Sequence, residues 1–224
     1  MTRLFVIIAL LALAVSLFIS VKFFNDAYKV IPINPATEAE TVGEYQDWFP
    51  YESSVGGFKV MLPLLPQEAS QTVIDPKTQQ ENHYQMYVAQ ENNGTIFMIN
   101  VITYPSAPDA GGKLILLKGL MNGMVAADKK NELIEMTTTD YQGMPALHFS
   151  IENEERTIYA KEFMKGNTIY LLFVIAKPDQ LQDAKAKFAY FVKSFNLLEG
   201  AIPSATSSKL AEQPAATPLK TAPN

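Results

Sequence analysis

The chain has 224 residues, a formal net charge of −5 and no cysteine. The negative charge excludes nucleic acid as an expected partner, because binding to a phosphate backbone requires a cationic surface. The lack of cysteine excludes disulfides, thiolate nucleophiles and cysteine-ligated metal sites together.

The first element in chain order is an uncharged apolar run, residues 4–21 (LFVIIALLALAVSLFISV). Its eighteen residues, at about 1.5 Å each, form a helix of about 27 Å, close to the hydrocarbon thickness of a bilayer. We expect residues 1–24 to be a transmembrane signal anchor that leaves the following domain on the periplasmic or extracytoplasmic side. The alternative is a signal peptide that is cleaved near Ser16, which would release the protein into the periplasm.

Residues 25–50 are expected to form a tether that ends in an aromatic strip. Its first part, residues 25–42, is acidic and carries Pro32 and Pro35, a composition typical of linkers. The strip is EYQDWFPY and contains Tyr45, Trp48, Phe49 and Tyr51. One interpretation is that these side chains cover part of the domain core. The other makes them the predicted partner-binding residues, in contact with lipid headgroups or a protein, because Trp and Tyr favour half-wet positions.

Residues 51–198 are expected to form one α+β domain. Runs of strand-forming residues are separated by turn residues, and Glu91 to Gly94 (ENNG) is a strong hairpin signal. The predicted strands cover residues 58–62, 70–74, 84–90, 95–104, 132–139, 146–152, 157–164 and 168–176. Residues 96–102 and 169–176 are apolar on both faces, which predicts that both strands are central and covered on both sides.

Two helices are expected to flank this sheet. Apolar residues at helical spacing predict a first helix over residues 113–128, with Asp109 or a neighbour as its cap, and a second over residues 179–195. Gly119 and Gly123 weaken the first helix, so we expect them to allow close packing against the sheet. The predicted architecture is an antiparallel sheet of about six to seven strands in an α/β/α sandwich. The Ala-, Pro-, Ser- and Thr-rich residues 199–224 are predicted to be a disordered tail.

Few residues indicate chemistry. The two histidines, His83 and His148, lack the spacing of a metal-binding motif, and there is no phosphate-binding loop or nucleophile elbow. A hydrolase that uses His148 with a nearby carboxylate is a minor alternative. A carboxylate cluster at a predicted turn is expected to be a solvated tip; its members are Glu152, Glu154 and Glu155. The sequence therefore predicts no catalytic residue, no cofactor and no metal site.

Several packing and turn residues resemble the PsbP-like fold superfamily, which includes photosystem II PsbP, the Ran-binding Mog proteins and the envelope protein DcrB. The matching features are Phe58, Val60, Pro63 and Pro66 in an F-x-V-x-x-P-x-x-P opening, the Gly143-x-Pro145 turn, the apolar strand 169–176, and a final helix that ends in Lys193-Ser194-Phe195. The resemblance implies an antiparallel sheet flanked by helices in a binding or assembly accessory. It implies no shared catalytic set.

Together these features predict a non-enzymatic, membrane-tethered envelope domain. We expect it to bind a protein partner or to assist assembly of a membrane complex. The alternative is a carrier of a small ligand or lipid, which would require an apolar cavity between the sheet and a helix. The tether, the aromatic strip and the lack of catalytic clusters favour the first interpretation.

Overall fold

The computed structural model describes Tyr45, residues 47–74 and residues 79–198. The predicted membrane anchor, the tether up to residue 44 and the predicted tail all lie outside these residues. Within the described ranges, no helix is both long and apolar enough to cross a membrane. The anchor therefore stays a prediction from residues 4–21.

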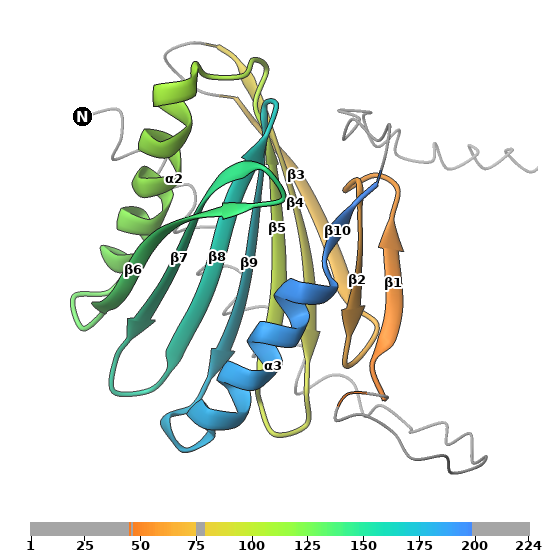
Figure 1. Cartoon of the computed structure of the whole chain (residues 1–224), viewed down its shortest axis with the longest axis vertical. Helices are drawn as coiled ribbons and strands as arrows, with labels where there is room; N and C mark the ends of the chain where they lie inside the picture. The colour runs from red at the N-terminus through yellow and green to blue at the C-terminus, as the bar shows by residue number, and fades with distance from the viewer. Residues whose placement is uncertain (1–44, 46, 75–78, 199–224) are drawn as a thin grey trace, which may run out of the picture.

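The central element is a seven-stranded antiparallel sheet, as the sequence predicted (Figure 1). In spatial order its strands are β3 (Gln67–Ile74), β4 (Glu81–Gln90), β5 (Ile96–Thr103), β9 (Thr168–Ala176), β8 (Thr157–Lys165), β7 (Met144–Glu152) and β6 (Glu132–Tyr141). β5 and β9 pair at the middle, with Phe97 opposite Val174. Side chains on both faces of these two strands are buried, so the prediction that they are central is confirmed.

Helix α2 (Ala110–Val125) covers one face of the sheet, mainly over β7 and β8. Asp109 caps it, because its carboxylate accepts a hydrogen bond from the Gly112 backbone N–H at 2.5 Å. The helix begins three residues before the predicted start, since this cap outweighs the low helix propensity of the glycines in the first turn. The expected close packing at Gly119 is wrong, because a Cβ built there would meet no atom within 4 Å.

The opposite face is covered by α3 and by a second, small sheet. A 3-10 turn, η1 (Pro178–Gln180), leads into α3 (Leu181–Ser194). The small sheet has the order β1 (Phe49–Ser53), β2 (Phe58–Leu62) and β10 (Asn196–Leu197), all antiparallel. Figure 1 shows α3 in front of the large sheet, with the small sheet beside it. This second layer is thus part helix and part sheet, which refines the predicted α/β/α sandwich.

Two apolar cores result from this layering. The core under α3 and the small sheet contains Phe97, Leu172, Phe191 and Phe195. The core under α2 contains Leu117, Met121, Phe149 and Leu171 among its buried residues. The first core also includes Trp48, which brings part of the aromatic strip into the packed structure.

Candidate functional site

The aromatic strip lies across α3 and the large sheet. The Tyr45 ring stacks on Tyr190 of α3 with centroids 4.6 Å apart. Trp48 is only 7% exposed, and its ring lies edge-on to Phe97 at 5.0 Å and to Tyr190 at 5.2 Å. Edge-to-face and offset pairs at these separations are favourable beyond the area they bury. Tyr45 and Trp48 therefore cover the core, as one of the two interpretations of the strip predicts.

Tyr51 continues the strip on β1 and packs against the rings of Phe58 and Tyr87, at 6.2 and 5.9 Å. Its hydroxyl donates a hydrogen bond to the carboxylate of Glu68 on β3. Burial, with that carboxylate as a further cause, raises the pKa of Tyr51 above its ordinary value. The hydroxyl is therefore a stable donor that joins the small sheet to the large one.

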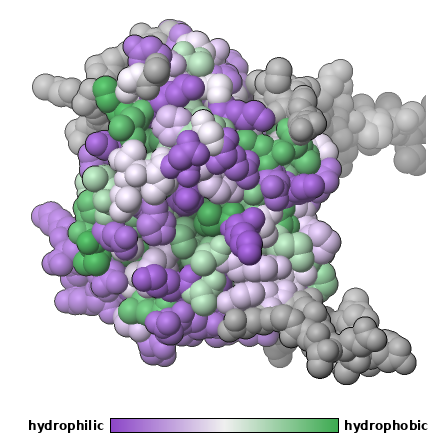
Figure 2. Space-filling view, in the orientation of Figure 1, coloured by the Kyte–Doolittle hydropathy of each residue, from purple (hydrophilic) through white to green (hydrophobic). Residues whose placement is uncertain are grey.

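Among the four aromatic residues of the strip, Phe49 is the one whose side chain is mostly exposed. Phe49, the first residue of β1, is 51% exposed. Leu64 and Leu65, which follow β2 after Pro63, are also exposed, and β1 and β2 are paired at this end through Phe49 and Leu62. We call Phe49, Leu64 and Leu65 the apolar rim. On the face that Figure 2 shows, hydrophobic residues form separate patches among hydrophilic ones.

A pocket of about 440 Å³ lies next to the apolar rim. One wall is aromatic and apolar, with Tyr45, Trp48 and Leu64. The other wall comes from the turn between β4 and β5 and from α3. The full lining is Tyr45, Asp47, Trp48, Pro63, Leu64, Glu91, Asn92, Asn93 and Lys187. The pocket thus combines an aromatic surface with charged groups, a mixture suited to an amphipathic side chain of a partner.

The charged wall of the pocket is held by Lys187 of α3. Its ammonium lies 2.9 and 2.8 Å from the two carboxylate oxygens of Glu91 and 2.9 Å from Asp183. Burial alone would lower the pKa of Lys187, but its hydrogen bonds to both carboxylates outweigh that effect and raise it. The ion pair with Glu91 is mostly shielded from solvent and attaches the β4–β5 turn to α3.

The two histidines lie on separate strands and do not form a site. His83, on β4, makes a 2.9 Å hydrogen bond through Nδ1 with Thr72 on the neighbouring strand. His148, on β7, is half-buried and lies 5.8 Å from the ring of Phe188. Burial lowers the pKa of His148; Glu135 opposes this effect. β5, β9 and β8 separate the strands that carry the two histidines.

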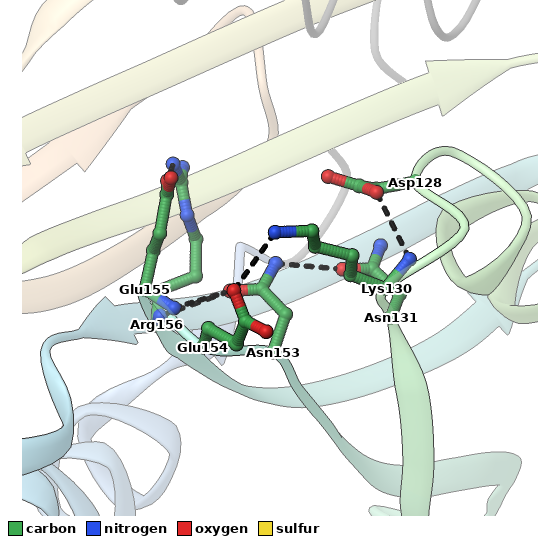
Figure 3. A network of polar contacts seen from close by, with 7 residues as sticks. All are labelled: Asp128, Lys130, Asn131, Asn153, Glu154, Glu155 and Arg156. Atoms are coloured by element: carbon green, nitrogen blue, oxygen red, sulfur yellow. Dashed lines mark hydrogen bonds and ion pairs between the residues drawn. The ribbon is translucent and has the colours of Figure 1, made fainter.

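The carboxylates of the β7–β8 turn belong to a surface network. Lys130 reaches Glu154 at 2.8 Å, and Arg156 reaches Glu155 at 3.1 Å (Figure 3). Asn153 donates to Asn131 across the two turns at 2.8 Å. Glu154 and Glu155 are thus paired with cations at an exposed turn, as expected of a solvated tip, whereas Glu152 lies at the end of β7 opposite Glu132. Within the part of the chain that the structure describes, no group of three or more potential ligands could hold a metal ion.

Sequence reasoning missed one buried carboxyl. Glu162 on β8 is 0% exposed, and neither carboxylate oxygen has a hydrogen-bond partner among the described residues. It lies on the α2 face, in one cross-strand row with Leu171 and Asn100, whose side-chain oxygen is also unpaired. Burial raises the pKa of Glu162 well above its ordinary value. One sequence signal could have indicated this buried carboxyl. Glu162 alternates with Ile158, Ala160 and Met164, so it lies on a strand face that is otherwise apolar.

Comparisons with known proteins bear on the fold only. No protein-family model and no curated protein matches the chain. The structure is similar to the solution structure of cyanobacterial PsbP from Synechocystis, with a TM-score of 0.43 and 14% identity over 73% of this chain and 99% of that one. It is also similar to the crystal structure of PA94 from Pseudomonas aeruginosa, a protein of unknown function, with a TM-score of 0.37 and 10% identity over 63% of this chain and 91% of that one. A PsbP structure is thus among the matches.

Proposed function

We propose that this chain is a non-enzymatic binding domain of the cell envelope, anchored in a membrane through residues 1–24, that docks a protein partner beside the aromatic strip. The observation that carries the proposal is the apolar rim of Phe49, Leu64 and Leu65, exposed next to a pocket with an aromatic wall. The domain faces the periplasm or the exterior. Its partner is a component of a membrane complex.

The energetics of the rim favour a partner. Full burial of a Leu or Phe side chain contributes about 1.5–3 kcal/mol, so these three half-exposed side chains offer a few kcal/mol on docking. Apolar anchors beside a pocket are the usual place where binding energy concentrates in an interface. Trp48 and Tyr45 are already packed against Tyr190, so the pocket wall needs little ordering when a partner binds.

The place of the rim in the chain supports a partner close to the membrane. Phe49 lies at the end of the predicted tether, residues 25–50, so the rim is close along the chain to the predicted membrane segment. A tether of about 25 residues confines the domain near the bilayer and raises the effective concentration of a membrane-bound partner. Cleavage near Ser16 would remove this advantage while leaving the rim intact.

No observation favours the alternatives as strongly. A small-ligand or lipid carrier would need an apolar cavity between the sheet and α2, and that layer contains a packed cluster that includes Leu117, Met121 and Phe149. A hydrolase based on His148 would need that ring open to a substrate, whereas it lies half-buried beside Phe188.

Site-specific photocrosslinking in intact cells tests the proposal. A photoreactive residue in place of Phe49 should capture one defined protein, and Leu65→Asp in the same chain should abolish that capture. The matched control is Ile115 on α2, which is 65% exposed on the opposite layer and should capture nothing. Equal capture from both positions, or capture unaffected by Leu65→Asp, would refute docking at the rim. Protease accessibility in spheroplasts, with the mass of the amino-terminal peptide, tests the membrane anchor separately.

A further inference from the structure

β6 forms one edge of the large sheet. It pairs with β7 on one side, and in the part of the chain that the structure describes no strand pairs with its other side. Ten residues at about 3.4 Å each give an edge of about 34 Å. An edge of this kind presents unpaired backbone N–H and C=O groups, which can accept a further strand.

The edge of β6 carries no lysine and no proline, the two residues that most often prevent further pairing at an edge strand. Its charged residues are all acidic, so they would repel an acidic strand and attract a basic one. Three of its apolar side chains are exposed within four residues: Leu133 at 39%, Ile134 at 54% and Met136 at 40%. A bulge between Leu133 and Glu135 is the one irregularity in its pairing. β3, the other edge, is shorter and has Ile74 as its exposed large apolar residue.

Except for Asp140, which pairs with Pro145 on the α2 face, the acidic and apolar side chains of β6 lie on different faces. Its pairing places Leu133 and Met136 opposite Ile151 and Phe149, on the face that α2 covers. Glu132 and Glu135 lie on the other face, and Glu132 is directly opposite a further carboxylate, Glu152. The strand also carries Asp140 and has no Lys or Arg. Like charges placed opposite each other are unfavourable, so added cations on this face would stabilise it.

The beginning of β6 is held in place before any partner arrives. Figure 3 shows the loop before β6 linked to the β7–β8 turn by Lys130–Glu154 and by Asn153–Asn131. Asn131 also donates to the backbone carbonyl of Met124 at the end of α2. A preorganised edge loses less conformational entropy when another strand pairs with it.

We propose that β6 is a second docking surface, which accepts an extended segment of a partner protein in which basic and apolar residues alternate. Such a segment places apolar side chains next to Leu133 and Met136 and basic side chains next to Glu132 and Glu135, because successive side chains of a strand point to opposite faces. A second copy of this chain is disfavoured as the occupant, since its β6 would bring the same three carboxylates and no cation.

The proposal is tested with a defined probe, the fluorescein-labelled peptide KVKIKVK, and the full 224-residue chain in detergent micelles. Fluorescence anisotropy should show binding of this peptide and at least tenfold weaker binding of EVEIEVE and of KVKPKVK. Loss of binding with KVKPKVK separates strand addition from simple charge attraction, because its charge is unchanged. Amide hydrogen exchange with KVKIKVK bound should show new protection in β6.

Two variants with matched chemistry locate the surface. Glu132→Lys together with Glu135→Lys should weaken KVKIKVK binding at least tenfold, and Glu81→Lys on β4 should leave it unchanged. Three results would each overturn the proposal. They are binding of KVKPKVK equal to that of KVKIKVK, hydrogen-exchange protection confined to β3, and a dimer of the chain formed through β6. If the double variant does not fold, amide hydrogen exchange of the wild-type chain with KVKIKVK bound decides the question. Protection in β6 supports the proposal, and protection confined to β3 overturns it. Because β6 lies outside the rim, failure here leaves the crosslinking test at Phe49 unaffected.

Discussion

Replacing Glu162 with leucine is expected to stabilise the protein at neutral pH. The carboxyl is fully buried among apolar residues, and burial raises its pKa well above the ordinary value of 4.5. Between the unfolded-state pKa and the higher folded-state pKa, the folded state therefore holds a proton that the unfolded state has released. Stability falls as pH rises under this condition, because the folded state binds more protons than the unfolded state.

The size of this effect depends on how far the pKa of Glu162 is raised in the folded state. Each pH unit between the unfolded-state pKa and the higher folded-state pKa lowers the free energy of unfolding by at most about 1.4 kcal/mol. Below pH 4.5 this cost disappears, and what remains is the penalty for an unpaired buried polar group, about 1–3 kcal/mol. Glu162→Leu removes both costs, so its advantage should grow from acid to neutral pH.

Urea unfolding of the wild type and of Glu162→Leu at several pH values between 4 and 8 measures this difference. The wild-type free energy of unfolding should fall relative to that of the variant by up to about 1.4 kcal/mol per pH unit above pH 4.5. Glu81→Leu, which removes an exposed carboxylate from β4, serves as the control and should track the wild type. Parallel curves for the wild type and Glu162→Leu would refute the reasoning, because they would mean that Glu162 ionises in the folded state as it does in the unfolded chain.

The remaining predictions concern packing, backbone and charge, and urea or thermal unfolding checks each of them. Trp48→Ala should cost about 3–5 kcal/mol because the ring is buried, whereas Phe49→Ala should cost under about 1 kcal/mol. Gly119→Ala should stabilise α2 by up to about 1 kcal/mol because the added Cβ meets nothing, and a loss of stability would contradict this. Gly143→Ala should destabilise by about 1 kcal/mol or more because its φ is +80°, and an unchanged midpoint would contradict this. Lys187→Met should cost about 1–3 kcal/mol by leaving Glu91 without its cation, and this loss should persist in high salt because the pair is shielded.

Local sequence patterns predicted those strands whose own residues, or the turn residues beside them, indicate a strand. The apolar runs that became β5 and β9, and the turn residues between β6 and β7, are readable because they depend on neighbours in sequence. β10 was not predictable: it has two residues, and it exists because Asn196 and Leu197 pair with Lys59 and Phe58 of β2. β1 was not predictable as a strand either, because its pairing with β2 is visible only in three dimensions. Its first residues are therefore interpreted from the sequence as part of the aromatic strip.

The candidate surfaces show where sequence reasoning stops. Trp48 and Phe49 are neighbours of similar chemistry, yet Trp48 packs against Phe97 while Phe49 is half-exposed at the end of β1. Leu133 and Met136 are three residues apart and share one face only because of the bulge between Leu133 and Glu135, and α2 covers mainly β7 and β8 and leaves the edge strand open. Exposure at both surfaces is decided by which element lies above a residue, and no local pattern contains that information. The side chains that the fold leaves uncovered, Phe49 at the rim and Ile134 on β6, are consequently where a partner would be detected first.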